Sequence, residues 1–388
     1  METDRNKQES VLHEAFLPTS CVQNHAANLL ALPDGDLLCT WFAGTQEGIP
    51  DISIYLSRLK SGATEWSAPI KISDDPGRSE QNPVLNRLPD GSLWLFWTAQ
   101  VSGNQDTAIV RRRISFDNGM NWGPIEVLFD RPGTFVRQPL TVLATGEWLL
   151  PVFYCKNRPG QKWVGDEDTS AVKISRDEGK TWQEQPVPDS TGCVHMNIVD
   201  MKDGSLVAFF RSRWADQIYR SQSADRGENW TPPQPTELPN NNSSIQCVRL
   251  ADGNLAMAFN DRNAQGCSER RLSLYDDIGD NENLAPPTVQ CGSTAEKKTA
   301  FWGVPRAPMT VAISEDAGVT WPFRQDLDTG DGYCMTNNSK QGLNREYSYP
   351  SVIQTPDGVI HIAYTYFRQK IKYVAVTKAW IISGSAER

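Results

Sequence analysis

The sequence predicts an all-β fold in which residues 1–388 form a single six-bladed β-propeller. Three observations predict it: one short motif occurs four times, a tight-turn signal between two apolar runs occurs six times, and no segment keeps the 3.6-residue apolar period of a helix. The turn signals recur every 50 to 60 residues, roughly, over most of the chain, which is the length of one propeller blade. We therefore expect very little helix.

The repeated motif reads Ser-x-Asp-x-Gly-x-x-Trp, and its chemistry is that of a turn. Asp accepts hydrogen bonds from nearby backbone amides, and Gly adopts the positive φ of a tight turn. The Trp side chain requires a hydrophobic seat. Each copy therefore predicts a hairpin tip in one blade. The four copies are residues 115–122 (SFDNGMNW), 175–182 (SRDEGKTW), 223–230 (SADRGENW) and 314–321 (SEDAGVTW), with a degenerate copy at 59–66 (LKSGATEW).

A second repeated signal is a glycine, preceded by Asp or once by Thr, between two apolar or alternating runs. Such a turn predicts a β-hairpin. Six hairpins, each followed by a second pair of strands, give six four-stranded blades. The turn glycines are Gly35, Gly91, Gly146, Gly204, Gly253 and Gly358.

Two segments fall outside this repeat. Residues 265–305 are polar, rich in Asp, Asn and Pro, and lack a period, which indicates an insertion in blade five. The run Val11 to Leu17 precedes the first hairpin, and we expect it to pair with the last blade and close the ring.

Composition limits the partners. The net charge of −9 argues against nucleic acid or an anionic membrane as a partner, although a local basic pocket can still bind a small acidic molecule. The first ten residues lack the apolar core of a signal peptide, and no apolar run approaches a membrane span, so we expect a cytoplasmic protein while leaving export open. The sequence carries no signal for an oligomeric state.

The cysteines and histidines do not predict a metal site or a cofactor. The eight cysteines are scattered without a C-x-x-C pair, and there are four histidines. Free thiols are expected in a reducing compartment. Cys267 and Cys291 flank the insertion and are the best disulfide candidates if the protein is exported.

The repeated motif resembles the Asp box of the sialidase (neuraminidase) superfamily, and the chain resembles its sialidase-like proteins with BNR repeats. The resemblance extends from Asn24 to Tyr373. It implies a six-bladed propeller. It does not specify the reaction, because Asp boxes lie away from the chemistry and also occur in proteins that are not sialidases.

Sialidases hold the substrate carboxylate with three arginines, whose planar guanidinium groups grip a carboxylate through two hydrogen bonds. The resemblance places the second arginine at Arg211, seven residues after Gly204, and the third at Arg306 in RAPMTVAIS. The position of the first arginine, in NHAANLL, is occupied by His25.

The resemblance also implies a tyrosine nucleophile, a glutamate that activates it and an aspartate that acts as general acid. The nucleophile falls on Tyr349 in SYPSVIQTPDG, with Tyr347 on the same face of the strand as the second candidate. The activating position is His195. The loop GTQEGIPD offers Glu47 and Asp51 for the acid.

Further polar residues occupy the start of inner strands, where side chains face the pocket. Arg137 in FVRQPL holds this place in blade three, and Asn82 with Glu80 holds it in blade two. For every one of these residues the alternative is an ion pair or hydrogen bond in the core, which is also what we expect for His361. Arg345, Glu346 and Arg368 are additional candidates for the pocket lining.

Three functions remain open. The first is an exo-acting glycoside hydrolase of the sialidase type on an acidic sugar other than ordinary sialic acid, because the arginine triad is changed. The second is a lyase that eliminates at a uronic acid, in which arginine neutralises the carboxylate while His and Tyr move protons. The third is a carbohydrate-binding propeller without activity, favoured by the replacement of two expected catalytic side chains.

Overall fold

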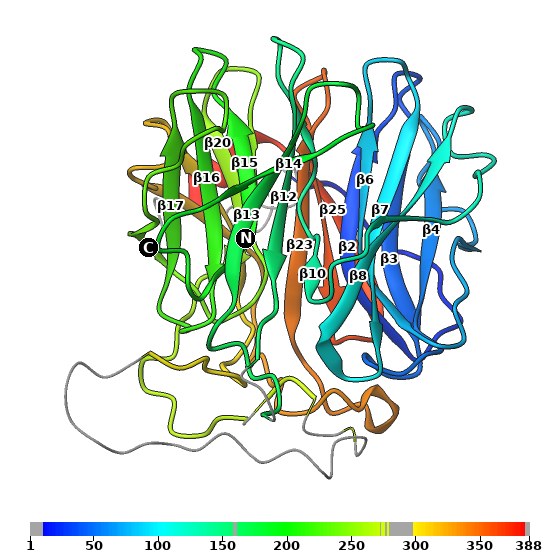
Figure 1. Cartoon of the computed structure of the whole chain (residues 1–388), viewed down its shortest axis with the longest axis vertical. Helices are drawn as coiled ribbons and strands as arrows, with labels where there is room; N and C mark the ends of the chain where they lie inside the picture. Colours follow the sequence, from blue (N-terminus) through cyan, green and yellow to red (C-terminus); the bar gives the residue numbers. More distant parts are fainter. Residues whose placement is uncertain (1–10, 158–160, 272, 276–277, 279–297, 385–388) are drawn as a thin grey trace, which may run out of the picture.

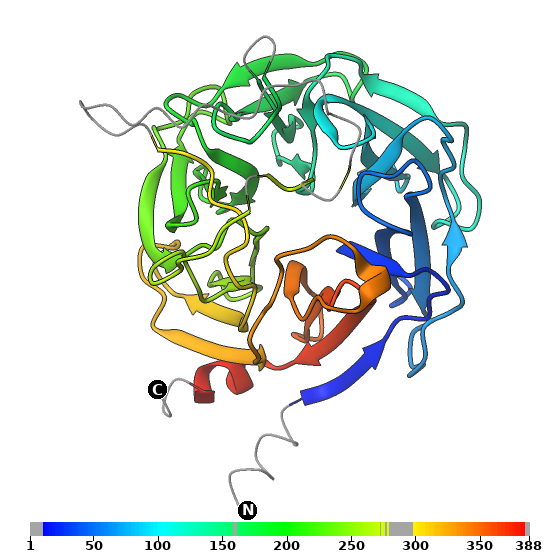
Figure 2. The same cartoon turned by 90° about the horizontal axis from the view of Figure 1, so that it is seen from below.

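The computed structural model describes residues 11–157, 161–271, 273–275, 278 and 298–384. Its strands form six antiparallel sheets, five with four strands and one with five. The sheets stand around a central axis like the blades of a propeller (Figure 2). The prediction of an all-β, six-bladed propeller is confirmed. Within the described ranges, regular helix is limited to η1 (Ser339–Gln341) and α2 (Lys378–Ser383).

The first three blades follow one another along the chain, each running from the axis outward. Blade one contains β2 (Gln23–Ala31), β3 (Leu37–Gly44), β4 (Ser53–Leu59) and β5 (Ile70–Lys71). Blade two contains β6 (Ser79–Arg87), β7 (Leu93–Val101), β8 (Asn104–Ser115) and β9 (Glu126–Phe129). Blade three contains β10 (Thr134–Phe135), β11 (Thr141–Val142), β12 (Trp148–Tyr154), β13 (Thr169–Ser175) and β14 (Gln183–Pro186), with β10 and β11 as two halves of its inner edge.

The remaining blades repeat this plan. Blade four contains β15 (Cys193–Asp200), β16 (Leu206–Ser212), β17 (Gln217–Ser223) and β18 (Gln234–Pro239). Blade five contains β19 (Gln246–Arg249), β20 (Leu255–Asn260), β21 (Met309–Ser314) and β22 (Phe323–Asp328). Blade six contains β23 (Tyr347–Gln354), β24 (Ile360–Tyr366), β25 (Lys370–Val376) and β1 (Val11–Phe16).

Ring closure comes from the N-terminal strand. β1 pairs antiparallel with β25, with Val11 opposite Val376 and Phe16 opposite Lys372. The first described strand therefore completes the last blade, as Figure 2 shows where the blue strand lies beside the red blade. The predicted closure by the run Val11 to Leu17 is confirmed.

The turn residues behave as their chemistry predicts. All six turn glycines have φ between 86° and 101° and lie between the first two strands of their blades. In the first copy of the motif, Gly119 N donates to Ser115 Oγ at 2.9 Å and Asn121 N donates to Asp117 Oδ1 at 2.8 Å. The other three copies repeat both bonds. In an up-and-down sheet the first-to-second and third-to-fourth connections share one end, so all of these turns lie at one end of the propeller, which we call the turn end.

At the opposite end, four inner strands carry the same irregularity. β2, β6, β15 and β23 each shift register near their start, and each shift contains a residue in the left-handed region. Such a conformation is strained for residues other than glycine and persists only where the surroundings hold it. The four residues are Ala26 (φ 63°), Asn82 (φ 52°), His195 (φ 54°) and Tyr349 (φ 52°). Three of these four are residues that the sequence singled out.

A ring of side-chain hydrogen bonds joins each inner strand to the next just beyond these bulges. Each link uses one polar side chain and one backbone group of the neighbouring blade, which satisfies backbone atoms that no ladder reaches. The links are Asn28 to Leu85, Asn86 to Leu140, Thr141 to Ile198, Asn197 to Cys247, Gln246 to Val352 and Ser351 to Leu29. The ring fixes the inner strands around the axis and so holds the bulges in register.

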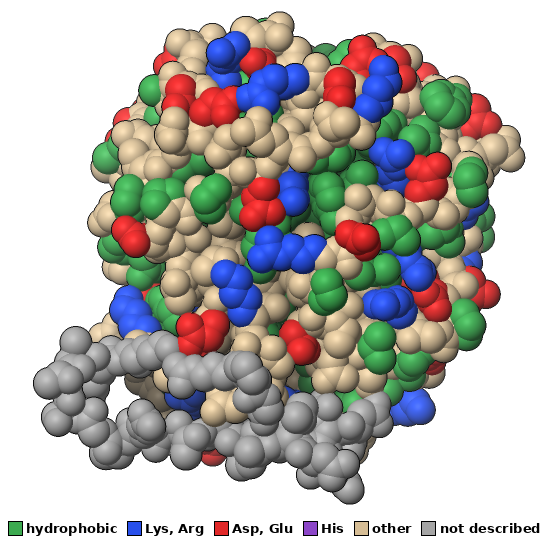
Figure 3. Space-filling model, in the orientation of Figure 1, with side chains coloured by type: hydrophobic (Ala, Val, Ile, Leu, Met, Phe, Trp, Pro, Cys, Tyr) green, Lys and Arg blue, Asp and Glu red, His purple; other side chains and the backbone are tan. Residues whose placement is uncertain are grey.

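The expected insertion corresponds to the connection between β20 and β21, at the end opposite the turns (Figure 1). Residues 272, 276–277 and 279–297 of it, including Cys291, are outside the described part. Cys267 is partly exposed. In Figure 3, acidic and basic side chains are interspersed over the face shown. Among the helices described, none is long and apolar enough to cross a membrane.

Candidate functional site

Tyr349 lies at the centre of a buried cluster of cationic side chains at the axis. Its side chain is 5% exposed, and the Cζ atoms of three arginines lie 5.4 to 5.6 Å from its ring centre. These are Arg137, Arg211 and Arg306. Arg211 Nη1 donates to Tyr349 Oη at 2.6 Å. A guanidinium has no acceptor, so the phenol oxygen accepts this bond.

His195 lies beside the same arginine on the bulge of β15. Its Nε2 is 3.4 Å from Arg211 Nη1, and its Nδ1 is 3.0 Å from Ser244 Oγ. Its ring centre is 5.7 Å from that of Tyr349. Burial, followed by the charge of Arg211, holds the pKa of His195 well below its ordinary value. This imidazole is therefore neutral at pH 7.

His25, which precedes the bulge of β2, is closer to the tyrosine. The two ring centres are 4.2 Å apart. His25 Nδ1 lies 2.8 Å from Thr365 Oγ1, whereas Nε2 is buried without a hydrogen-bond partner. Burial, and then the charge of Arg368, lowers the pKa of His25 well below its ordinary value. A neutral imidazole with an unused nitrogen is suited to accept a proton.

Arg137 and Arg211 are buried cations that no ion pair neutralises within the described part of the chain. Arg137 Nη2 donates to backbone carbonyls of β2 and β23, while its Nε and Nη1 are unpartnered. Arg211 Nε donates to Asn242 Oδ1, while its Nη2 is unpartnered. Burial lowers the pKa of Arg137 to about 10 and that of Arg211 to about 9. Both are charged at pH 7, and their unused N–H groups are suited to an anion.

Glu346 balances the other side of the cluster. Its Oε1 accepts from Arg306 Nη1 at 3.0 Å, Arg368 Nε at 3.1 Å and Ser348 Oγ at 2.7 Å. Burial alone would raise the pKa of Glu346, but the charges of Arg306 and Arg368 outweigh it and hold that pKa at about 2. Arg368 Nη1 also donates to Glu47 Oε2 at 2.5 Å. Four arginines and two carboxylates leave the cluster with a positive excess.

The two candidate acids take different places. Glu47 is 3% exposed and joins the cluster through Arg368. Asp51, at the end of the same loop, is exposed and accepts a bond from Thr45 N at 3.3 Å. The structure brings Glu47, and not Asp51, to the cluster.

The remaining candidate site residues lie in different environments. Asn82 occupies the bulge of β6 with its Oδ1 buried and unpartnered. Tyr347 packs in the core between blades five and six, and its Oη donates to Thr329 O at 3.0 Å. The expectation that it shares a face with Tyr349 is wrong, because the bulge at Tyr349 breaks the alternation of β23. Arg345 is exposed and pairs with Asp331.

A cavity of about 10 Å³ lies against Arg306, Glu346 and Arg368. This is about the space of one water molecule. Its cover consists of Arg271, Leu274, Trp302 and Asn337, none of which the sequence pointed to. Trp302 lies with its ring centre 5.6 Å from Arg211 Cζ. The cluster is therefore enclosed rather than open to a sugar.

The positions of Asn242, Ser244 and Thr365 also escaped sequence reasoning. Asn242 and Ser244 precede β19, where the inner strands of the other blades carry the candidate residues, so a strict alignment of the blades would have found them. Thr365 and Trp302 have no comparable signal, because they reach the cluster from β24 and from the insertion.

The sequence matches the family model of the BNR repeat-like domain over residues 35–362. The chain belongs to this family. No curated protein matches it significantly. Among solved structures, an intramolecular trans-sialidase from Ruminococcus gnavus in complex with oseltamivir carboxylate is 14% identical with a TM-score of 0.66, over 96% of this chain and 99% of that one.

Two further structures resemble this BNR repeat-like protein. Hadza microbial sialidase Hz136 is 15% identical with a TM-score of 0.65, over 93% of this chain and 66% of that one, so this chain spans about two thirds of its length. A protein of unknown function from Dyadobacter fermentans DSM 18053 is 16% identical with a TM-score of 0.67, over 95% and 98% of the two chains. At these identities the likeness establishes a shared sialidase-like fold.

Proposed function

We propose that this BNR repeat-like propeller is a glycoside hydrolase of the sialidase type that acts on a sugar bearing a carboxylate. One observation carries the proposal: a buried tyrosine, Tyr349, accepts a hydrogen bond from Arg211 beside guanidinium N–H groups that have no partner. Arg137 and Arg211 lack a carboxylate partner in the described part of the chain, and the carboxylate of a sugar supplies one.

In the proposed reaction, Tyr349 Oη attacks the anomeric carbon. A phenol suits this step because it is neutral when it approaches an anionic sugar, and tyrosine nucleophiles are known in sialidases. A neutral imidazole takes the phenol proton, and His195 and His25 are the two candidates. Glu47 protonates the leaving oxygen as the glycosidic bond breaks. Water then cleaves the tyrosyl glycoside, with the same groups returning the protons.

Elimination at a uronic acid is the second candidate, and the state of the ionisable groups favours it. His25 and His195 are both neutral, and elimination needs no carboxylic acid, whereas the Glu47 carboxylate is ion-paired with Arg368. An arginine would neutralise the sugar carboxylate, and an imidazole would remove the proton on the adjacent carbon. The Tyr349 phenol would protonate the leaving oxygen as the carbon–carbon double bond forms.

Turnover of acidic glycosides by wild type and Tyr349→Phe tests the proposal. With uronate and ketodeoxy-acid glycosides as the panel, Tyr349→Phe is expected to lose activity by about 10³-fold or more. Tyr347→Phe is the matched control in the same strand and is expected to retain activity. A product that absorbs in the ultraviolet identifies elimination, whereas a free reducing sugar without absorbance identifies hydrolysis.

The outcomes exclude each other. Equal product from Tyr349→Phe and wild type contradicts both reactions. A wild-type protein that turns over no member of the panel supports the carbohydrate-binding alternative instead.

A further inference from the structure

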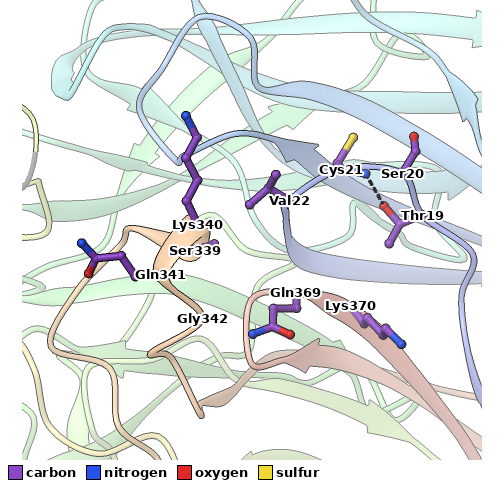
Figure 4. A pocket seen from close by; sticks show the side chains of 10 residues that line it. All are labelled: Thr19, Ser20, Cys21, Val22, Ser339, Lys340, Gln341, Gly342, Gln369 and Lys370. Carbon is purple, nitrogen blue, oxygen red and sulfur yellow. Dashed lines mark hydrogen bonds between the residues drawn. The ribbon is translucent and has the colours of Figure 1, made fainter.

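Two spaces of very different size lie on opposite sides of one short segment. The cavity against Glu346 and Arg306 measures about 10 Å³, whereas an open groove beside it measures about 500 Å³. The groove is built from the chain before β2, the segment around η1 and the turn before β25, as Figure 4 shows. Sites for small molecules usually enclose about 300 to 1,000 Å³. The groove has this size and the cavity does not.

Residues 337–339, which we call the wall, separate the two spaces. Asn337 lines the cavity, and Ser339 lines the groove. Gln23 at the start of β2 holds both, because its Nε2 donates to Asn337 O at 2.8 Å and to Ser339 Oγ at 2.7 Å. On the cavity side, Asn337 also bonds to Arg271 and to Leu274 O. These hydrogen bonds contribute to closing the cavity, and a single bond of this kind is weak enough to open locally.

The groove has the chemistry of a site for a hydroxyl-rich, acidic ligand. Its ten lining residues include Lys340 and Lys370 and contain no carboxylate. Thr19, Gln341 and Gln369 add hydroxyl and amide groups. Figure 4 shows that these side chains come from three separate segments. Lysine ammonium groups and neutral amides are typical partners of sugar carboxylates and hydroxyls.

We propose that the groove binds the leaving-group part of an acidic oligosaccharide and that the wall is the gate through which its terminal sugar reaches Tyr349. This inference rests on the proposed function for the identity of the terminal sugar. The wall moves outward into the groove, which supplies the room, and the two spaces then form one elongated site. An enclosed terminal site with an outer groove is the shape that exo-cleavage requires.

The reactivity of two cysteines can measure opening of the gate without any catalytic turnover. Cys334 lines the cavity and is 6% exposed, whereas Cys21 lines the groove and is partly exposed. Alkylation by iodoacetamide, followed residue by residue with mass spectrometry, measures how often each becomes accessible. Ser339→Ala removes one bond of the wall and is expected to speed alkylation of Cys334 about fivefold.

The controls separate gating from general loosening. Ser205→Ala makes the same change at the turn end and is expected to leave the alkylation of Cys334 as in wild type. Cys193 and Cys247, buried within blades, are expected to react at wild-type rates in every variant. An unchanged rate at Cys334 in Ser339→Ala, or a parallel rise at all three buried thiols, overturns the gate.

The groove is tested by ligand protection in Tyr349→Phe, which prevents turnover. A uronic-acid trisaccharide is expected to slow alkylation of both Cys21 and Cys334, and the double variant Lys340→Ala/Lys370→Ala is expected to lose the protection of Cys21. Protection of Cys334 alone, or of neither thiol, overturns the groove as a site for acidic sugars. Protection of both thiols without wild-type turnover would reject the hydrolase and keep the groove.

Discussion

The two ends of this propeller are built on opposite rules. At the turn end, each repeat makes the same bonds: Asp117 Oδ1 receives a backbone N–H, and so do its three counterparts. At the opposite end, which carries the candidate site and which we call the site end, four of the six blades share a bulge but fill it differently, with Ala26, Asn82, His195 or Tyr349. Regularity at one end indicates that the repeat encodes the scaffold, and the departures from it at the other end supply side chains of the candidate site.

Charge follows the same division. The carboxylate of Asp117 is exposed to water, and hydrogen bonds from Asn121 lower its pKa to about 2. Glu346 has a similar pKa for a different reason, because buried arginines outweigh the cost of its burial. Water can replace the hydrogen-bond partners of the exposed Asp117 carboxylate, but it cannot replace the arginines around the buried Glu346 carboxylate. Removing a charge from the buried cluster should therefore lower the free energy of unfolding more than removing an exposed charge.

The largest expected effect is at Glu346. Glu346→Gln keeps the shape but leaves Arg306 and Arg368 buried with one counter-ion fewer, which should lower the free energy of unfolding by about 4 kcal/mol. Asp331→Asn is the matched control, since it breaks an exposed pair with Arg345 and should cost less than about 1 kcal/mol. Urea unfolding at pH 7 measures both. Equal losses in the two variants would contradict the difference between buried and exposed carboxylates.

Much of the scaffold was predictable because turns are local. Gly35 and the five other turn glycines predict their hairpins from a few neighbouring residues. The pairing of the strand from Val11 follows from the need to complete blade six. The conformation of a turn depends mainly on the residues that form it, so the sequence of a few residues predicts it.

The site was only partly predictable because its contacts join distant parts of the chain. Tyr349, Arg211 and Arg306 carry a family pattern, and the structure brings them together. Glu346 and Arg368 match no family pattern, and their role depends on partners 20 or more residues away. Trp302 covers the cavity from the long connection between β20 and β21, where no sequence period indicates what a side chain will contact.

The next largest loss of stability is expected from a substitution at the turn end, and it should leave turnover unchanged. A Cβ at Gly318 would lie 2.3 Å from Phe209 Cζ, at a φ of +79°. Gly318→Ala should therefore lower the free energy of unfolding by about 3 kcal/mol through backbone strain and overpacking. At Gly204 a Cβ has open space, so Gly204→Ala should cost about 1 kcal/mol from its φ alone. Thermal unfolding measures the difference, and a change in turnover by either folded variant would contradict the separation of the ends.

The smallest effect compares one histidine from each end. Burial lowers the pKa of His195 well below its ordinary value and that of His361, beside the blade-six turn, to about 4. Above pH 6.5 both are neutral whether folded or unfolded. Below it the unfolded chain binds a proton that the folded one refuses, so stability falls by up to about 1.4 kcal/mol per pH unit for each histidine.

Replacing either histidine should therefore remove a similar part of the acid sensitivity. His195→Gln and His361→Gln should each flatten the dependence of unfolding free energy on pH between pH 6 and 5, measured by urea titration at both values. Only His195→Gln should also reduce turnover, because His361 bonds to Tyr373 and Thr355 rather than to the cluster. The two histidines are expected to contribute equally to acid sensitivity, so turnover is the property that distinguishes the two ends. If His361→Gln reduced turnover as much as His195→Gln, the activity would depend on the stability of the whole propeller and not on the residues at the bulges.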